Sequence, residues 1–419
     1  MRVLFHRYGS IVEPDILEAF SQLNIDVIKD EMEITQKNID PDTRVSTLAE
    51  LILENRPDMV FSINFFPYIS QICEKLGVIY AALSVDCPVL EIYSDTIRNK
   101  CNRIFLFDYA QYESVVNENP EGIFYLPLAS NTDIWDAISV PTDADGRILY
   151  KYNVSFIGSL YTEKSPIRNA RLSELNRGYV DGILAGAGKF TDLSLAEEVV
   201  RTNPDMVSFL KEGLPELWAK CDIGAAVTDI DEYVSAMQVL GFELSARDRI
   251  KLLNSVASLS YTPEMTGDES RYAADADKSI LSVFTRSETG DLDRAAGAIT
   301  THGGVSTHEE MPRIFKQSKI NLNPTIRSIK TGLPQRIWDI MGCGGLVLTN
   351  FQAEIPEYFE IGEDLLCYEN DRDCAELIAY YLSHDEEREA IALSGYNKVK
   401  ALHTYVIRIA KMLSMIYPE

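Results

Sequence analysis

The sequence contains little of what marks a disulfide framework, a zinc site or a membrane span. Its 419 residues include seven cysteines, an odd number with no Cys-x-x-Cys pair, and only five histidines. We interpret the scattered cysteines as reduced thiols of a cytoplasmic protein, because disulfides persist mainly in oxidising compartments. No apolar run approaches the ~20 residues that a membrane helix needs. The chain begins directly with a strand-like segment at residues 2–5, so we expect no secretory signal.

Positive charge is also scarce. Lysine and arginine number 39 against 64 aspartate and glutamate, which gives a net charge of −25. Such a chain repels nucleic acid and anionic membrane surfaces, so neither is an expected partner. No Walker loop and no Gly-x-Gly-x-x-Gly follows the first strand, which disfavours kinases, NTPases and nicotinamide enzymes. Against this acidic background a basic loop at residues 327–336 is conspicuous.

What the sequence does contain is a regular alternation of strands and helices. Helical segments separate the short apolar strands expected in the first 135 residues, at 3–5, 25–28, 59–63, 78–83, 104–107 and 124–126. This alternation predicts the α/β class with a doubly wound parallel sheet. In such sheets, ligands bind at the carboxyl ends of the strands.

The turn-rich segment 136–150 predicts a connection between two domains. We therefore expect an amino-terminal domain at 1–135, a second α/β domain at 151–400, and a last helix at 401–419 that packs back on the protein. The second domain carries a helical insertion at about 165–258, with helices expected at 193–202, 206–220, 230–240 and 246–258. Strands are expected to resume near 259–262 and at 280–286.

The stretch 319–350, KINLNPTIRSIKTGLPQRIWDIMGCGGLVLTN, predicts a strand, a polar loop, a helix and a buried strand. This is the parallel crossover of an α/β sheet. Pro334 favours a helix start there, because proline fits the first helical position. The unpaired N–H groups and the dipole of that helix favour an anion in the loop.

Three cations lie close to that helix start, and they suit a diphosphate: Arg327 and Lys330 in the loop, and Arg336 in the first helical turn. Asp339, about one turn further along, has a carboxylate that could accept hydrogen bonds from ribose hydroxyls. From the pattern alone, an ordinary crossover with a basic loop is an equally good interpretation.

Two other groups of residues give no credible metal site. His302 and His308 with Glu309 match neither one helix face nor a usual zinc spacing. Asp275 and Asp277 form an Asp-any-Asp pattern typical of metal-dependent sugar transfer, but they lie in a polar segment with no strand before it. We therefore expect a solvated acidic loop there.

With these residues described, a resemblance can be stated. The stretch 319–350, followed by EIPEYF, DCAELIAYYLSHDEERE, LSGYNKV and LHTY, resembles the CgeB-like glycosyltransferases, often labelled spore-maturation proteins. The resemblance covers residues 300–419 strongly and the amino-terminal half loosely. It implies the GT-B fold, in which two Rossmann-like domains face each other across a cleft.

The resemblance implies a nucleotide-diphosphate-sugar donor, by default a UDP-sugar, used without a metal or another cofactor. A helix acid in the position of Asp339 would hold the donor ribose, and the three cations named above would face the diphosphate. The turn at Gly158 and Ser159 is similar to a loop that approaches the donor phosphates. The remaining expected donor-binding residues are Asn323, Gly332, Leu333, Gly344, Gly345, Thr349 and Asn350.

For a catalytic base we nominate His6 or Asp86, which follow the first and fourth expected strands and can each take a proton. The structural alternatives are that His6 orients a loop and that Asp86 caps a helix. Asp339 stands where many relatives have glutamate, and no paired-glutamate signature is present, so retaining and inverting chemistry both stay open. Two other functions also stay open: a nucleotide-sugar epimerase, and a non-catalytic binding or spore-surface assembly protein. The acceptor is not identified.

Overall fold

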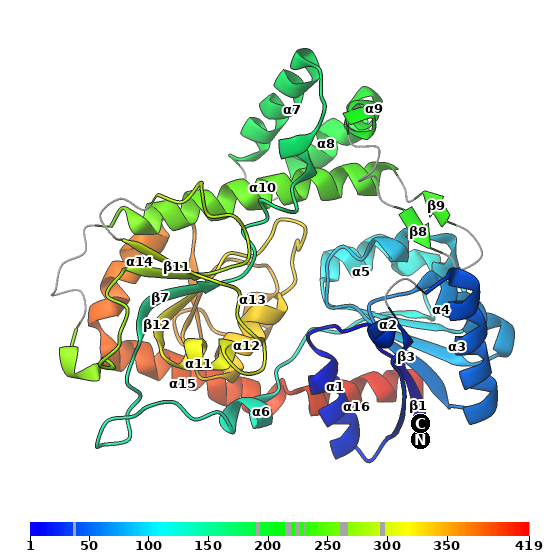
Figure 1. The fold of residues 1–419 in the computed structure, drawn as a ribbon, viewed down its shortest axis with the longest axis horizontal. Helices are drawn as coiled ribbons and strands as arrows, with labels where there is room; N and C mark the ends of the chain where they lie inside the picture. The colour runs from blue at the N-terminus through cyan, green and yellow to red at the C-terminus, as the bar shows by residue number, and fades with distance from the viewer. Residues whose placement is uncertain are drawn as a thin grey trace.

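The computed structural model describes residues 1–36, 39–189, 193–213, 220–222, 227–229, 232–259, 267–293 and 298–418. Two six-stranded parallel sheets dominate it (Figure 1). We call the part built on β1 to β6 the amino-terminal lobe, and the part built on β7 and β10 to β14 the carboxy-terminal lobe. The predicted α/β class with two parallel sheets is confirmed.

The amino-terminal sheet has the order β2-β1-β3-β4-β5-β6. Its strands are β1 (Arg2–His6), β2 (Asp26–Asp30), β3 (Met59–Ile63), β4 (Ile79–Leu83), β5 (Asn102–Leu106) and β6 (Ile123–Tyr125). Its helices are α1 (Glu13–Gln22), α2 (Met32–Thr35), α3 (Pro41–Asn55), α4 (Pro67–Leu76) and α5 (Tyr109–Val115). Val3 and Phe5 pack in the apolar layer that contains α1, whereas Leu4 packs on the other face with α3 and α4. Both faces are covered, so the strands are apolar at successive positions.

The carboxy-terminal sheet has the order β11-β10-β7-β12-β13-β14. Its strands are β7 (Tyr152–Ile157), β10 (Leu281–Phe284), β11 (Ile299–His302), β12 (Ser318–Asn323), β13 (Val347–Asn350) and β14 (Leu366–Tyr368). Its helices are α11 (Met311–Lys316), α12 (Gln335–Gly342), α13 (Ile355–Tyr358), α14 (Asp371–Ser383) and α15 (Asp385–Leu402). Because β7 and β12 are central, the loops that follow them lie in the middle of the carboxyl edge.

Between β7 and β10 the chain forms the predicted helical insertion. Its elements are α7 (Glu174–Ala187), α8 (Ser194–Thr202), α9 (Pro204–Gly213), α10 (Glu232–Ala257) and the antiparallel pair β8 (Lys220–Asp222) and β9 (Val227–Asp229). The helices have an apolar core of their own, to which Val180, Leu184, Leu210 and Leu240 contribute.

Three details of the sequence prediction differ from the structure. The helices predicted at 230–240 and 246–258 are one helix, α10, with Gly241 inside it. A Cβ at Gly241 would lie 3.6 Å from Leu193, so this glycine serves close packing and does not end a helix. Of the helix predicted at 206–220, α9 forms the part up to Gly213, residues 214–219 lie outside the described residues, and Lys220 belongs to strand β8 instead. The short strand β11 was not predicted, and residues 260–262 of the strand expected at 259–262 lie outside the described residues.

Two crossings of the chain join the lobes. The first runs through α6 (Thr132–Asp136) into β7, and the second leads from α15 into α16 (Tyr405–Ile416), which returns to the amino-terminal lobe and packs beside α1 (Figure 1). The crossings are hydrogen-bonded to each other. Ser130 N donates to His403 O, and Tyr405 N donates to Ser130 O, both at 3.0 Å.

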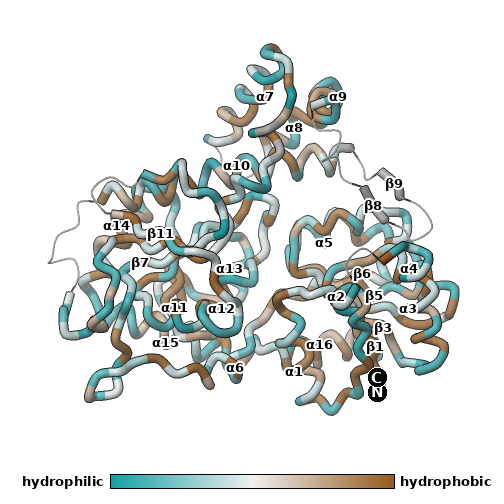
Figure 2. The backbone as a smooth tube through the Cα atoms, in the orientation of Figure 1, coloured by the Kyte–Doolittle hydropathy of each residue, from teal (hydrophilic) through white to brown (hydrophobic). Residues whose placement is uncertain are grey.

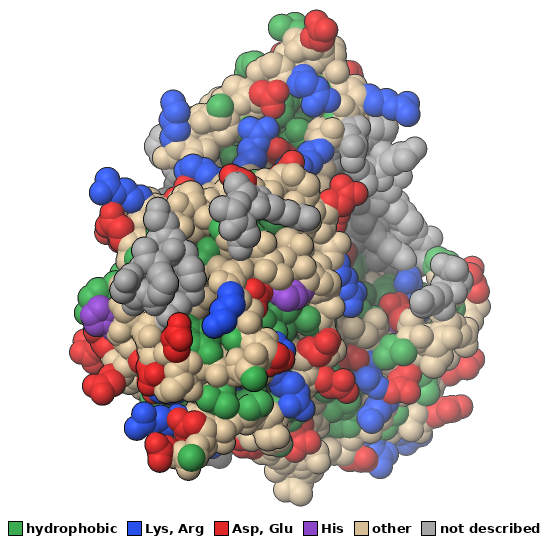
Figure 3. Space-filling view, turned by 60° about the vertical axis from the view of Figure 1, so that its left-hand side comes forward, with side chains coloured by type: hydrophobic (Ala, Val, Ile, Leu, Met, Phe, Trp, Pro, Cys, Tyr) green, Lys and Arg blue, Asp and Glu red, His purple; other side chains and the backbone are tan. Residues whose placement is uncertain are grey.

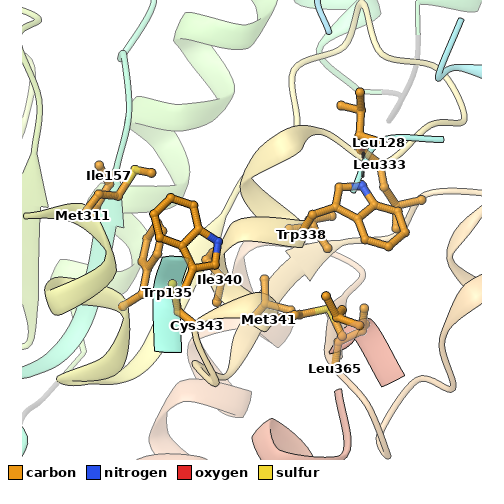
Figure 4. Close-up of a cluster of buried hydrophobic side chains, with 14 of the residues drawn as sticks. Leu128, Trp135, Ile157, Met311, Leu333, Trp338, Ile340, Met341, Cys343 and Leu365 are labelled. Atoms are coloured by element: carbon orange, nitrogen blue, oxygen red, sulfur yellow. Dashed lines mark hydrogen bonds between the residues drawn. The ribbon is translucent and has the colours of Figure 1, made fainter. Parts of the chain in front are cut away.

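An apolar cluster at the junction holds α12 in place (Figure 4). Leu128 and Trp135 from the first crossing pack with Trp338 and Met341 of α12. The Trp135 indole N–H donates to Ser130 Oγ at 3.0 Å, so the buried ring keeps a hydrogen-bond partner. Side chains from both lobes therefore fix the helix whose first turn reaches the space between them.

Within the described residues, no helix combines the length and the apolar character that crossing a membrane requires. Figure 2 shows hydrophilic stretches interrupting the hydrophobic ones along the helices. On the face seen in Figure 3, basic side chains lie among acidic ones.

Candidate active site

A cleft of about 820 Å³ lies between the two lobes. Segments that follow β1, β3 and β4 line its amino-terminal wall, and segments that follow β7 and β12 line its carboxy-terminal wall together with the start of α12. The carboxyl edges of both sheets thus face the same space, where ligands of open α/β sheets bind. The cleft is also within the usual size range of small-molecule sites.

The carboxy-terminal wall carries two guanidinium groups, those of Arg249 and Arg336. Arg249 extends from α10 and donates to two backbone carbonyls, Ser159 O and, at 2.8 Å, Pro324 O. Its Nε has no hydrogen-bond partner among the described residues. The nearest carboxylate to Arg336 is Asp339, at 3.8 Å. Burial lowers the pKa of both guanidinium groups, and their mutual repulsion contributes to the lowering at Arg249.

Asp339 lies behind Arg336 and does not line the cleft. Its side chain is 4% exposed, and it accepts a hydrogen bond from Gln335 Nε2 at 2.7 Å. Burial raises the pKa of this carboxyl to about 6, while the Arg336 cation acts in the opposite direction. The Asp339 carboxylate therefore influences the cleft indirectly, through its contacts with Gln335 and Arg336, whose side chains line the cleft.

Three more of the expected donor-binding residues line the cleft: Gly158, Ser159 and Asn323. Gly158 N donates to Phe284 O at 3.0 Å, which continues the sheet to the edge of the cleft. The Asn323 amide donates to Thr349 Oγ1 at 3.0 Å. Thr349 and Asn350 do not line the cleft themselves. They hold the loop after β12, since Asn350 Oδ1 accepts from Thr325 N at 2.7 Å.

The structure places Arg327 and Lys330 away from the cleft. The Arg327 guanidinium binds both carboxylate oxygens of Asp248 and donates to Ala187 O at 2.8 Å. Lys330 Nζ pairs with Glu197 of α8. Both cations thus tie the loop to the helical insertion, whose carboxylates neutralise them.

The backbone N–H groups of this loop do bind an anion, but it is a carboxylate of the amino-terminal lobe. Asp108 Oδ2 accepts hydrogen bonds from the N–H groups of Lys330, Thr331 and Gly332 at 2.7, 2.9 and 3.0 Å. Its Oδ1 caps α5 by accepting from Gln111 N at 2.8 Å. The sequence predicted a diphosphate in this loop, at the N–H groups that begin the Pro334 helix; in this structure the N–H groups of the loop itself are bound by Asp108. We call this contact the Asp108 latch.

A second carboxylate fastens the same loop from the other side. Glu354 of the carboxy-terminal lobe accepts from Tyr109 N at 2.8 Å, from Tyr125 Oη and from Thr331 Oγ1. The fit around Gly332 is tight, because a Cβ there would lie 2.9 Å from Phe107 O. The neighbouring Leu333 is 2% exposed and belongs to the junction cluster of Figure 4.

Gly344 and Gly345 lie at the other end of α12 from the cleft. They line a separate cavity of about 460 Å³ together with Ser318, where β12 begins. The helix runs antiparallel to the strands of its crossover, so residues after its end meet the amino edge of the sheet. They do not reach a ligand at the carboxyl edge.

The amino-terminal wall presents Asp86 to the cleft as an exposed carboxylate. Asn64 Nδ2 donates to Asp86 Oδ2 at 2.8 Å and to the Tyr8 hydroxyl at 3.1 Å. Burial raises the pKa of Tyr8 to about 12 and raises that of Glu91, a second carboxyl on this wall.

His6 lies beneath this wall and does not line the cleft. It is 1% exposed, and both ring nitrogens are engaged: Nδ1 with Asp30 Oδ2 at 2.7 Å and Nε2 with the Tyr68 hydroxyl at 3.0 Å. Of the two nominated bases, the structure therefore brings only Asp86 to the cleft.

Sequence reasoning missed Arg249, Asn64, Glu91 and Asp108. Arg249 lies within a helix of the insertion, and Asp108 meets a loop more than two hundred residues further along the chain. No local pattern marks either of them. In the described part of the chain, no group of three or more His, Cys, Asp or Glu side chains is arranged to hold a metal ion.

Comparison with known proteins adds a family similarity and the fold. Residues 282–414 match the family model described as glycosyl transferase-like. Sucrose-phosphate synthase from Thermosynechococcus elongatus aligns over 100% of this chain and 99% of its own, with a TM-score of 0.53 and 10% identity. HepE from Anabaena in complex with UDP-glucose aligns over 99% of both chains, with a TM-score of 0.50 and 9% identity.

The fold is GT-B. The predicted enzyme class, a glycosyltransferase, is confirmed by the family match together with this fold. Among curated proteins, none matches the sequence.

Proposed function

We propose that the protein transfers a sugar from a nucleotide-diphosphate-sugar, with a UDP-sugar as the first choice, to a hydroxyl group of its acceptor. One observation carries the proposal: two guanidinium groups and an exposed carboxylate face each other across the cleft. The family match agrees with it, and the similar HepE structure holds UDP-glucose. We also propose that the chain is a CgeB-like member of the group, with the domain boundaries 1–135, 151–400 and 401–419.

Arg249 and Arg336 are the proposed diphosphate ligands. When the bond between the sugar and the diphosphate breaks, the electron pair leaves with the nucleoside diphosphate, whose negative charge must be stabilised. Fixed guanidinium groups in a partly buried site provide this stabilisation without reorganising, typically contributing several kcal/mol. In this proposal the two arginines take the place of a metal ion. Ribose binding by Asp339 stays a prediction, as do the roles first given to Arg327 and Lys330.

Asp86 is the proposed base. The acceptor oxygen forms a bond to the anomeric carbon, and its proton passes to the Asp86 carboxylate, which the Asn64 amide holds in place. This assignment describes an inverting reaction. We prefer Asp86 to His6, because both nitrogens of His6 are engaged below the wall.

UDP binding by calorimetry tests the donor site. Arg249→Gln and Arg336→Gln should each weaken UDP binding about tenfold to hundredfold, because a hydrogen bond to a charged group contributes ~1.5–3 kcal/mol. Arg247→Gln is the matched control, since Arg247 lies on the same helix and pairs with Glu243 and Asp181 outside the cleft. Equal UDP affinity in Arg249→Gln and Arg247→Gln would refute the proposed site.

Two alternatives are tested with the same protein. An epimerase would convert UDP-glucose to another UDP-sugar without any acceptor, whereas a transferase would only hydrolyse it slowly. A non-catalytic assembly protein would bind no nucleotide, or would bind it without turnover.

A further inference from the structure

A third cavity, of about 310 Å³, opens beside the cleft. It shares Cys87, Pro88 and Gln238 with the cleft, so the two spaces meet at that wall. The loop after β12 separates them, because Ile329 lines the cleft while Ser328 and Lys330 line the cavity beside it. We call this cavity the side chamber. The other residues used below that line it are Gln111, Val234 and Met237.

The charged groups of the side chamber are already neutralised. Two carboxylates, Asp108 and Glu197, and two cations, Arg201 and Lys330, line it, so its formal charge is zero. Glu197 pairs with Lys330, Arg201 lies 3.6 Å from the carboxylate of Glu198 on the same helix, and Asp108 accepts four backbone N–H groups. A charged ligand would therefore find no free counter-ion among these four residues.

The hydrogen-bonding capacity that is left in the chamber belongs to uncharged groups. Gln111 is 5% exposed, and neither the nitrogen nor the oxygen of its amide has a hydrogen-bond partner among the described residues, although the Tyr93 hydroxyl lies close to it. Ser328 is 8% exposed, and its hydroxyl also lacks a partner there. A buried polar group without a partner is destabilising, so two such side chains at one cavity point to a ligand that supplies the missing hydrogen bonds.

We propose that the side chamber binds the uncharged, largely apolar part of the acceptor, with an amide or hydroxyl of that acceptor bonded to Gln111 and Ser328. Val234 and Met237 supply apolar contact. This inference rests on the proposed transferase function, since Asp86, the proposed base, directly precedes the shared residue Cys87. An acceptor seated in the chamber would direct its reacting hydroxyl past Cys87 and Pro88 into the cleft.

The test uses 4-acetamidophenol, which joins a neutral amide to an aromatic ring and a hydroxyl. Its dissociation constant is measured by ligand-observed NMR on the full chain without nucleotide. Val234→Phe fills the chamber and should weaken binding at least tenfold. Val199→Phe makes the same change in a half-buried position on α8 that lines neither cavity, and it should bind like the wild type. The anion 4-hydroxybenzoate should bind at least tenfold more weakly.

Gln111→Leu separates a ligand role from a structural one. It should weaken probe binding while leaving the melting temperature unchanged or higher, because it removes an unpaired buried amide. A lower melting temperature of Gln111→Leu would overturn the proposal. So would a probe that fails to bind the wild type at millimolar concentration, or that binds Val234→Phe as well as it binds the wild type. UDP affinity should be unchanged in Val234→Phe, and a parallel loss would overturn the separation of chamber and donor site. Failure of the wild type to bind UDP would overturn the proposed function without altering the probe result.

Discussion

The Asp108 latch can be tested by Asp108→Asn. The carboxylate is 1% exposed, and one of its oxygens accepts three consecutive N–H groups at 2.7, 2.9 and 3.0 Å. Asparagine keeps one acceptor oxygen, which can still cap α5 or serve the loop, but not both. The NH₂ group in the other position would face N–H donors or displace the loop.

The expected loss can be worked from these contacts. Each hydrogen bond to a charged group contributes ~1.5–3 kcal/mol, so the three together set an upper range of roughly 5–9 kcal/mol. Because the displaced loop would recover part of this through water, we expect a net loss of about 3–5 kcal/mol, as when one partner of a buried ion pair is removed.

Urea unfolding followed by tryptophan fluorescence measures the effect, since Trp135 and Trp338 are buried at the junction of the lobes. Asp143→Asn is the matched control. Its carboxylate accepts Asp145 N and Arg147 N at 2.9 and 2.8 Å in an exposed turn, so its loss should be no more than about 1 kcal/mol. If Asp108→Asn loses no more stability than Asp143→Asn, the latch does not hold the lobes together.

Further predictions concern catalysis, pH and packing. Asp86→Asn should lower the rate of sugar transfer by roughly 10²–10⁴-fold in an initial-rate assay, with UDP affinity unchanged, because only proton transfer is lost. Burial and nearby cations lower the pKa of His403 from 6.5 to about 4. The unfolded chain is therefore protonated first, so the stability that depends on the neutral ring is fully present above pH 6.5 and is lost as the pH falls towards 4. The shift corresponds to roughly 3 kcal/mol, which solvent screening of the partly exposed ring reduces to about 2 kcal/mol. His403→Gln should remove this part of the pH dependence in urea titrations. Gly342→Ala should cost about 2–3 kcal/mol in the same assay, because its Cβ would lie 2.0 Å from Ser130 Oγ. Gly178→Ala, in a helix with open space around it, should stabilise by ~0.5–1 kcal/mol, and a loss there would contradict the packing argument.

The features that the sequence predicted best are those that depend on local, repeating patterns of residues. Alternating apolar strands and helices are enough to specify two parallel sheets, and the rule for their carboxyl edges brought Asp86, Gly158 and Asn323 to the cleft. Arg336 also lies there, because the first turn of a crossover helix must meet that edge. The same rule explains why Gly344 and Gly345 lie far from the cleft, since a crossover helix ends at the amino edge of the sheet.

What the sequence could not give is which charges pair over long distances. Arg327 meets a carboxylate 79 residues away, and Lys330 meets one 133 residues away, so both cations are paired with carboxylates of the helical insertion in this structure. Arg249 is the converse case. It is one of two arginines on a long helix, and only the fold brings it to the cleft.

The return of α16 to the amino-terminal lobe has a practical consequence for engineering. Tyr405, Ile409 and Met412 are part of the apolar layer under β1, so a fragment that stops at residue 135 would expose that layer to water. An expressible version of this half would have to carry 404–418 on a linker. Residues near both chain ends also contact Asp58, since Arg2 N donates to its carboxylate at 2.7 Å and the Tyr417 hydroxyl donates to its carbonyl at 3.2 Å. Linking the two ends and opening the chain in the 136–150 segment would give a circular permutant in which residues 1–135 and 404–418 are contiguous.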